Sequence, residues 1–85
     1  MRSPSQTTLS RVTLCLSRIG VAGGEWRVND PFCDIWGWDS LRQARLIIEL
    51  QKEFQISFSV VEMESIISLE SGAQVIESHL GGLNL

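Results

Sequence analysis

The sequence predicts an all-α fold, a small four-helix bundle of three main helices and one short helix, with a long ordered loop between the first two. Apolar residues recur at helical spacing in three stretches, at residues 6–19, 40–54 and 68–80. Serines stand at the start of several of these stretches, where helix caps are favoured. Only residues 55–59 alternate apolar and polar side chains, and no second segment shares that pattern, so we expect an extended connector there rather than a strand.

The chain has 85 residues, and we expect one domain over residues 1–85 with a disordered tail at 1–5. A domain of this size buries about 60% of its unfolded surface, which leaves little room for a deep active site. A substrate, carrier or adaptor is therefore favoured over an enzyme. The net charge of −3 disfavours nucleic acid, and no apolar run is long enough to span a membrane. We expect a cytoplasmic monomer.

The charges are unevenly distributed. The first 24 residues contain three arginines and no acid, which is also the composition of an organelle transit peptide. Removing them would delete the first predicted helix, so we assign them to the domain. That helix should run from Gln6 to Ile19 and end at Gly20. Its apolar side is formed by Leu9, Val12, Leu16 and Ile19.

The connection at residues 20–38 is too apolar for a solvated linker. We expect it to pack on the domain, with turns at Gly23-Gly24 and Asp30-Pro31, and with either Trp36 or Trp38 anchoring it at the next helix. The apolar residues that need burial are Val21, Trp26, Val28, Phe32, Ile35 and Trp36.

The stretch from Ser40 to Phe54 predicts a helix with two apolar sides. The core side holds Leu46, Ile47, Leu50 and Phe54, with Gln43 among them. The opposite side holds Leu41, Ala44 and Ile48, and the charged arc between the two sides holds Arg42, Arg45, Glu49 and Lys52. A surface helix needs only one apolar stripe, so the second one indicates a docking surface for another protein.

The C-terminal part predicts two further helices. Ser59 and Glu62 form a capping box at the start of a short helix that carries Val60, Met63 and Ile66 or Ile67. Ser68 caps the last helix, His79 lies in its final turn and Gly81-Gly82 ends it. The apolar side of the last helix is formed by Leu69, Ala73, Ile76 and Leu80.

Metal binding and nucleophilic catalysis are both disfavoured. Cys15 and Cys33 are far apart in sequence and His79 is the one histidine, so no metal site is expected. Two buried or partly buried free thiols in a reducing compartment are the favoured interpretation, and a Cys15–Cys33 disulfide is the alternative. Ser40 has no histidine nearby and no G-x-S-x-G turn around it.

Ser40 therefore has two remaining interpretations. It fits a helix cap, with Gln43 reaching back as in a capping box. It also fits a modified serine, because a helix N-terminus offers free N–H groups and a positive dipole end to an attached phosphate.

The segment Gly37-Trp38-Asp39-Ser40-Leu41, followed by residues 46–54, resembles the signature of the acyl carrier protein family. In that signature an Asp-Ser-Leu core leads into an amphipathic helix that ends in Glu-Phe. Ile56-Ser57-Phe58, Glu62 and Ser68-Leu69 follow in the order and spacing of the family. The resemblance covers about residues 6–80, and the tripeptide together with the downstream pattern is specific.

The resemblance implies that Ser40 carries a covalent 4′-phosphopantetheine arm whose thiol holds an acyl, aminoacyl or polyketide intermediate as a thioester. Asp39 would help to position Ser40 for the transferase. The stripe of Leu41, Ala44 and Ile48 would meet partner enzymes. The implied partners are a phosphopantetheinyl transferase, a loading enzyme and a downstream synthase or transferase.

One departure from the family pattern concerns charge. Carriers of housekeeping fatty-acid synthesis place acids along this helix, whereas this chain has Arg42 and Arg45. Either Arg45 pairs with Glu49 on a solvated surface, or the partners are neutral or acidic at their docking sites. The second interpretation favours a discrete carrier in a specialised pathway, such as polyketide, nonribosomal peptide or single-acyl transfer. The alternative function is a helical interaction module with a carrier-like fold and no prosthetic group.

Overall fold

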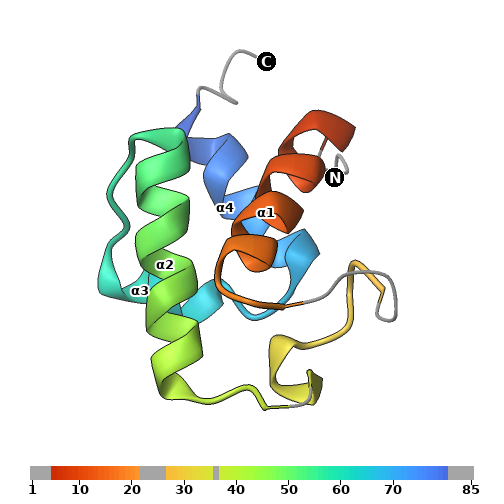
Figure 1. The fold of residues 1–85 in the computed structure, drawn as a ribbon. Helices are drawn as coiled ribbons and strands as arrows, with labels where there is room; N and C mark the ends of the chain where they lie inside the picture. Colours follow the sequence, from red (N-terminus) through yellow and green to blue (C-terminus); the bar gives the residue numbers. More distant parts are fainter. Residues whose placement is uncertain (1–4, 22–26, 36, 81–85) are drawn as a thin grey trace.

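The computed structural model describes residues 5–21, 27–35 and 37–80. This part of the chain contains four α-helices, one 3₁₀ turn and no strand, which confirms the predicted all-α class. The elements are α1 (Gln6–Arg18), η1 (Phe32–Asp34), α2 (Ser40–Phe54), α3 (Val60–Ser65) and α4 (Leu69–His79) (Figure 1). The predictions for residues 1–4, Gly23-Gly24, Trp26, Trp36 and Gly81-Gly82 lie outside the described residues.

Both ends of α1 are closed by specific hydrogen bonds. Ser5 caps the helix by accepting from the Thr8 N–H at 3.2 Å, and its own N–H donates to a Glu77 carboxylate oxygen on α4 at 2.9 Å. Ser5 is therefore fixed to the bundle, although the sequence placed it in a disordered tail. At the other end Gly20 has a φ of 93°, a conformation that glycine adopts without strain. The N–H groups of Gly20 and Val21 donate to the carbonyls of the last turn, as in a Schellman motif.

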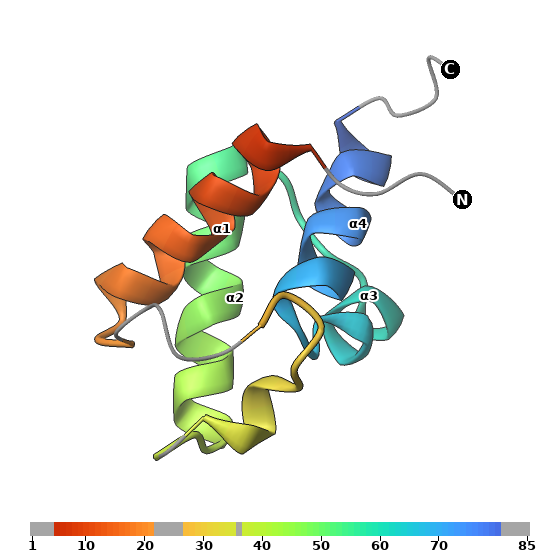
Figure 2. The same cartoon turned by 90° about the vertical axis from the view of Figure 1, so that its right-hand side faces the viewer.

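The core lies where α1, α2 and α4 meet. Figures 1 and 2 show α1 running beside α2 on one side and crossing α4 on the other. The core side predicted for α2 is buried as expected, and Leu46 and Leu50 have no exposed surface. The buried apolar residues are Val12, Cys15, Leu16, Val21, Phe32, Leu46, Ile47, Leu50, Phe54, Phe58, Ile66, Leu69, Ala73 and Ile76.

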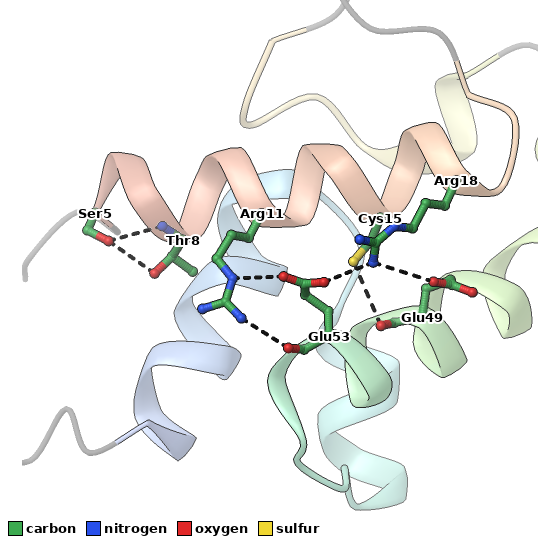
Figure 3. Close-up of polar contacts among 7 residues, drawn as sticks. All are labelled: Ser5, Thr8, Arg11, Cys15, Arg18, Glu49 and Glu53. Atoms are coloured by element: carbon green, nitrogen blue, oxygen red, sulfur yellow. Dashed lines mark hydrogen bonds and ion pairs between the residues drawn. The ribbon is translucent and has the colours of Figure 1, made fainter.

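A cluster of charged side chains joins α1 to α2 across the edge of this core (Figure 3). Glu53 accepts from Arg11 Nε at 2.9 Å and from an Arg18 guanidinium nitrogen at 2.8 Å, and these bonds lower the pKa of its carboxyl. Arg11 also donates to the Glu53 carbonyl, at 3.0 Å. Glu49 lies 3.8 Å from Arg18, and no ion pair joins it to Arg45 within the described ranges. The alternative in which Arg45 pairs with Glu49 is therefore not what the structure shows, because α1 supplies Arg18 as the partner of Glu49.

The two cysteines are free thiols in different environments. Cys15 is buried beneath the cluster, and its Sγ points to the Glu49 carbonyl at 3.8 Å (Figure 3). Burial, with the nearby Glu53 carboxylate, raises the pKa of Cys15 to about 11. Cys33 is exposed in η1. The prediction of two free thiols is confirmed, but the prediction that both are at least partly buried is wrong for Cys33, because the η1 turn places its side chain at the surface.

The long connection packs on the bundle through both its backbone and its aromatic side chains. Phe32 is buried and stacks on Trp38, with ring centroids 5.1 Å apart. The Phe32 N–H donates to the Ile67 carbonyl at 2.6 Å, and the Glu70 N–H donates to the Val28 carbonyl at 2.8 Å. These bonds fix residues 27–35 against the junction of α3 and α4 (Figure 2). The predicted anchoring role is confirmed for Trp38, while the Val28 side chain remains half-exposed rather than packed.

The predicted serine caps of α3 and α4 are confirmed. Ser59 Oγ accepts from the Glu62 N–H at 3.2 Å, and Glu62 accepts in return from the Ser59 N–H at 2.8 Å. Ser68 forms the corresponding box with Ser71. The second Glu62 oxygen lies 2.9 Å from His79 Nε2, which ties α3 to the end of α4. No residue of α3 is fully buried, but Met63 is partly buried against the core, and the polar contacts add to this packing in positioning the helix.

Candidate functional site

Asp39, and not Ser40, caps helix α2. Its backbone is extended and its carboxylate accepts from the Arg42 N–H at 2.8 Å. The Asp39 carbonyl accepts the Gln43 N–H, the first bond of the helical ladder. Ser40 is consequently the first residue inside the helix, and of its two interpretations the one as a helix cap is wrong. Asp39, one position earlier, accepts the hydrogen bond from a free N–H group at the start of the helix, which is the task of a capping side chain.

Gln43 also departs from the predicted capping box. Its side chain instead bridges two other segments. Its Nε2 donates to the Ile66 carbonyl at 2.9 Å, and its Oε1 accepts from Trp38 Nε1 at 3.2 Å. Gln43 therefore joins the start of α2 to the long connection and to the end of α3. One sign of this role is visible in the sequence, where an amide side chain lies within an otherwise apolar core stripe.

The Ser40 hydroxyl is available for modification. Ser40 is exposed, and its Oγ has no hydrogen-bond partner among the residues that the structure describes. It stands in the first turn of a 15-residue helix, where free N–H groups and the helix dipole favour an attached phosphate. The residues present therefore fit a phosphodiester on Ser40 Oγ. Because Asp39 caps α2, a group attached to Ser40 Oγ leaves the N-terminal cap of the helix intact.

An open groove begins at Ser40 and is lined by residues of α2 and α3 together with Ile67, which follows α3. Its volume is about 640 Å³. Polar side chains from Ser40, Gln43, Gln51 and Glu64 line parts of it. Along α2 the lining runs from Ser40 to Gln51, about 16 Å at about 1.5 Å per residue. The rest of the lining is apolar and consists of Ala44, Ile47, Ile48, Val60, Met63 and Ile67.

The second apolar stripe of α2 is exposed as the helical pattern predicted. Leu41 is 59% exposed and Ile48 is 50% exposed, and Ala44 lies between them on the groove side. Arg42 and Arg45 belong to the same outward half of the helix. The structure adds exposed apolar residues from α3, including Val60 at 69%. The sequence did not reveal these, because nothing in it states which side of a six-residue helix meets the core.

Two other kinds of site are absent from the described residues. No group of three His, Cys, Asp or Glu side chains is arranged to hold a metal ion there. His79, the last residue of α4, lies 2.9 Å from a Glu62 carboxylate oxygen. Figure 1 shows the end of α4 and the start of α2, which is Ser40, at opposite ends of the bundle. Ser40 and His79 are thus not brought together. None of the helices in the described ranges is long and apolar enough to cross a membrane.

Comparison with known families agrees with this geometry. A family model described as the phosphopantetheine attachment site matches residues 12–76. The match covers more than half of the 85 residues and includes Ser40, all of α2 and all of α3. The chain therefore belongs to the phosphopantetheine attachment site family, in agreement with the acyl carrier resemblance, and its cofactor is covalently attached 4′-phosphopantetheine.

Proposed function

We propose that the protein is a discrete acyl, aminoacyl or polyketide carrier whose arm is attached to Ser40 Oγ. The observation that carries this proposal is the exposed Ser40 hydroxyl, free of hydrogen bonds within the described residues and located where the groove begins. Ser40 Oγ accepts the phosphopantetheinyl group of coenzyme A and loses its proton, while adenosine 3′,5′-bisphosphate leaves. The bound arm supplies a thiol on which cargo is held as a thioester.

The chain's own residues position the cargo and catalyse no step. Asp39 fixes the first turn of α2 and so holds Ser40 toward the transferase. The apolar groove accommodates an apolar part of the cargo, since its lining is mostly hydrocarbon. Leu41, Ala44 and Ile48 form a docking stripe beside Ser40. Tethering the cargo raises its effective concentration at each partner enzyme.

The partners are a phosphopantetheinyl transferase, a loading enzyme and a downstream synthase or transferase. Arg42 and Arg45, in place of acids, support a specialised pathway rather than general fatty-acid synthesis. The free thiols of Cys15 and Cys33 support a reducing compartment such as the cytoplasm.

Intact mass spectrometry tests the proposal. The protein is incubated with coenzyme A and a broad-specificity phosphopantetheinyl transferase, beside Ser40→Ala and the control Ser57→Ala, an exposed serine outside the groove lining. The wild type and Ser57→Ala should each gain one phosphopantetheinyl group, and Ser40→Ala should gain none. A gain that persists in Ser40→Ala would place the arm elsewhere. No gain in any variant would favour the interaction module without an arm.

A further inference from the structure

The surface around the groove is apolar on both sides. We call it the docking surface and define it by Leu41, Ala44 and Ile48 of α2 with Val60 of α3 and Ile67, which lies between α3 and α4. Val60 and Ile67 are 69% and 58% exposed, so the apolar area extends well beyond the single helical stripe. Exposed apolar residues grouped beside a modification site are typical of a protein interface.

The α2 side of the docking surface carries unpaired positive charge. At about 100° per residue, Arg45 lies about 40° and Lys52 about 20° from Leu41 around the helix. Neither side chain has an ion-pair partner within the described ranges, and the same holds for Arg42. The one acid among them, Glu49, is turned toward Arg18 of α1.

The α3 side carries the opposite charge. Glu64 is exposed, lines the groove and has no ion pair in the part of the chain that the structure describes. Glu62, two residues earlier, is occupied by Ser59 and His79. The docking surface is therefore polarised, with cations along α2 and a carboxylate along α3.

We propose that this surface selects enzymes whose docking sites are apolar at the centre and bear carboxylates opposite α2 and a basic group opposite Glu64. This inference rests on the proposed function, because the partner must reach Ser40. Complementary charges accelerate association and fix orientation, and like charges reject other partners. An enzyme with a wholly basic docking site is repelled by Arg45 and Lys52. A protein partner is favoured over an anionic membrane because Glu64 borders the same surface and the net charge is −3.

A charge-swap experiment tests this inference. The probes are a phosphopantetheinyl transferase with basic residues around its carrier-docking site and its variant with those residues changed to Glu. Each is assayed by mass spectrometry for its initial rate on the wild type and on Arg45→Glu/Lys52→Glu. For each carrier, the rate with the acidic transferase is divided by the rate with the basic one. The combined ratio is this value for the wild type divided by the value for the variant, and it cancels the intrinsic activity of each transferase. We expect the wild type to prefer the acidic transferase and the variant to prefer the basic one, with the combined ratio about tenfold or more at low salt.

Salt and a matched control separate docking from other effects. The combined ratio should fall toward one at high salt, because the charges are exposed and screened. Arg27→Glu changes an exposed arginine outside the docking surface and should leave the preference of the wild type unchanged. A combined ratio near one at low salt, or an equal effect of Arg27→Glu, would overturn the inference.

Two further outcomes are distinguishable. If Ser40 is modified completely on long incubation while the combined ratio stays near one, the carrier function holds and the docking inference fails. If Ser40 is never modified, the proposed function itself fails.

Sedimentation with vesicles of phosphatidylglycerol and phosphatidylcholine provides the last check. Binding by the wild type that is lost in Arg45→Glu/Lys52→Glu would assign the surface to membranes and overturn the inference.

Discussion

At the start of α2 two neighbouring residues have separate tasks. Asp39 caps the helix, and the Ser40 hydroxyl has no hydrogen-bond partner among the residues that the structure describes. Asp39→Ala should lower the free energy of unfolding by about 1 kcal/mol, because the Arg42 N–H loses its partner. Asp39→Asn should remain close to the wild type, since asparagine caps nearly as well. Urea denaturation followed by circular dichroism measures both.

Ser40→Ala provides the counterpart at the adjacent position. Alanine is a good first-turn residue and Ser40 makes no cap bond, so stability should be unchanged while arm attachment is lost. A loss of stability in Ser40→Ala as large as that in Asp39→Ala would contradict the assignment of the cap to Asp39.

The two thiols should differ strongly in reactivity. Thiolate is the reactive form, and burial raises the pKa of Cys15 to about 11, whereas Cys33 is exposed. Iodoacetamide at neutral pH should therefore label Cys33 quickly and Cys15 only after denaturation. Peptide mass mapping of the wild type, with Cys33→Ser as the control, distinguishes the two sites. Rapid labelling of Cys15 in the native Cys33→Ser protein would show that the core beneath Glu53 opens readily.

Among the elements, the contact of α1 with α2 should depend on pH through Glu53. Arg11 and Arg18 lower the pKa of its carboxyl below the ordinary value of 4.5. The ionised form is favoured in the folded state, so its contribution to stability is complete above about pH 4.5 and is lost as the pH falls through the lowered pKa. Thermal unfolding of the wild type and Glu53→Gln from pH 7 to pH 3 measures this. The variant should be less stable at pH 7, and the difference should shrink in acid.

Glu64→Gln is the control for that measurement, because Glu64 is exposed and has no ion pair among the described residues. At pH 7 its stability should stay close to that of the wild type. If Glu53→Gln and Glu64→Gln behave alike, the charged cluster in Figure 3 contributes nothing specific.

The helices themselves were largely predictable from local sequence. Residues within a few positions of one another are enough to predict most helix boundaries. These boundaries are the start and end of α2, the caps at Ser59 and Ser68, and the end of α1 near Gly20. The cap at Asp39 was missed because aspartate and serine are both good caps and stand side by side. Local pattern alone could not decide between them.

Across the whole molecule, the contacts between distant segments were not predictable. Several hydrogen bonds join residues that no sequence periodicity relates, namely Ser5 with Glu77, Phe32 with Ile67 and Gln43 with Ile66. The same holds for the groove. The exposed stripe of α2 was visible in the sequence, but the opposite wall depends on how the cap at Ser59 and the Glu62–His79 contact orient α3.

A groove that receives cargo should make stability depend on the length of that cargo. A ligand that binds only the folded state raises the unfolding temperature, and each buried CH₂ contributes about 0.8 kcal/mol at most. Each kcal/mol shifts the midpoint of a domain this small by about 4–8 °C. The octanoyl form should therefore unfold several degrees above the acetyl form by calorimetry, because an acetyl group is too short to cover the apolar lining from Ala44 to Ile67.

Filling the groove from the protein side should abolish that difference. Ala44→Phe places a ring in the apolar lining, so the octanoyl and acetyl forms of this variant should unfold together. Ser10→Phe adds the same ring on an exposed position of α1 and should retain the wild-type difference. Equal midpoints for the two acyl forms of the wild type would mean that the cargo stays in solvent. The apolar lining would then serve partner enzymes alone, and its exposure between α2 and α3 would be explained by docking.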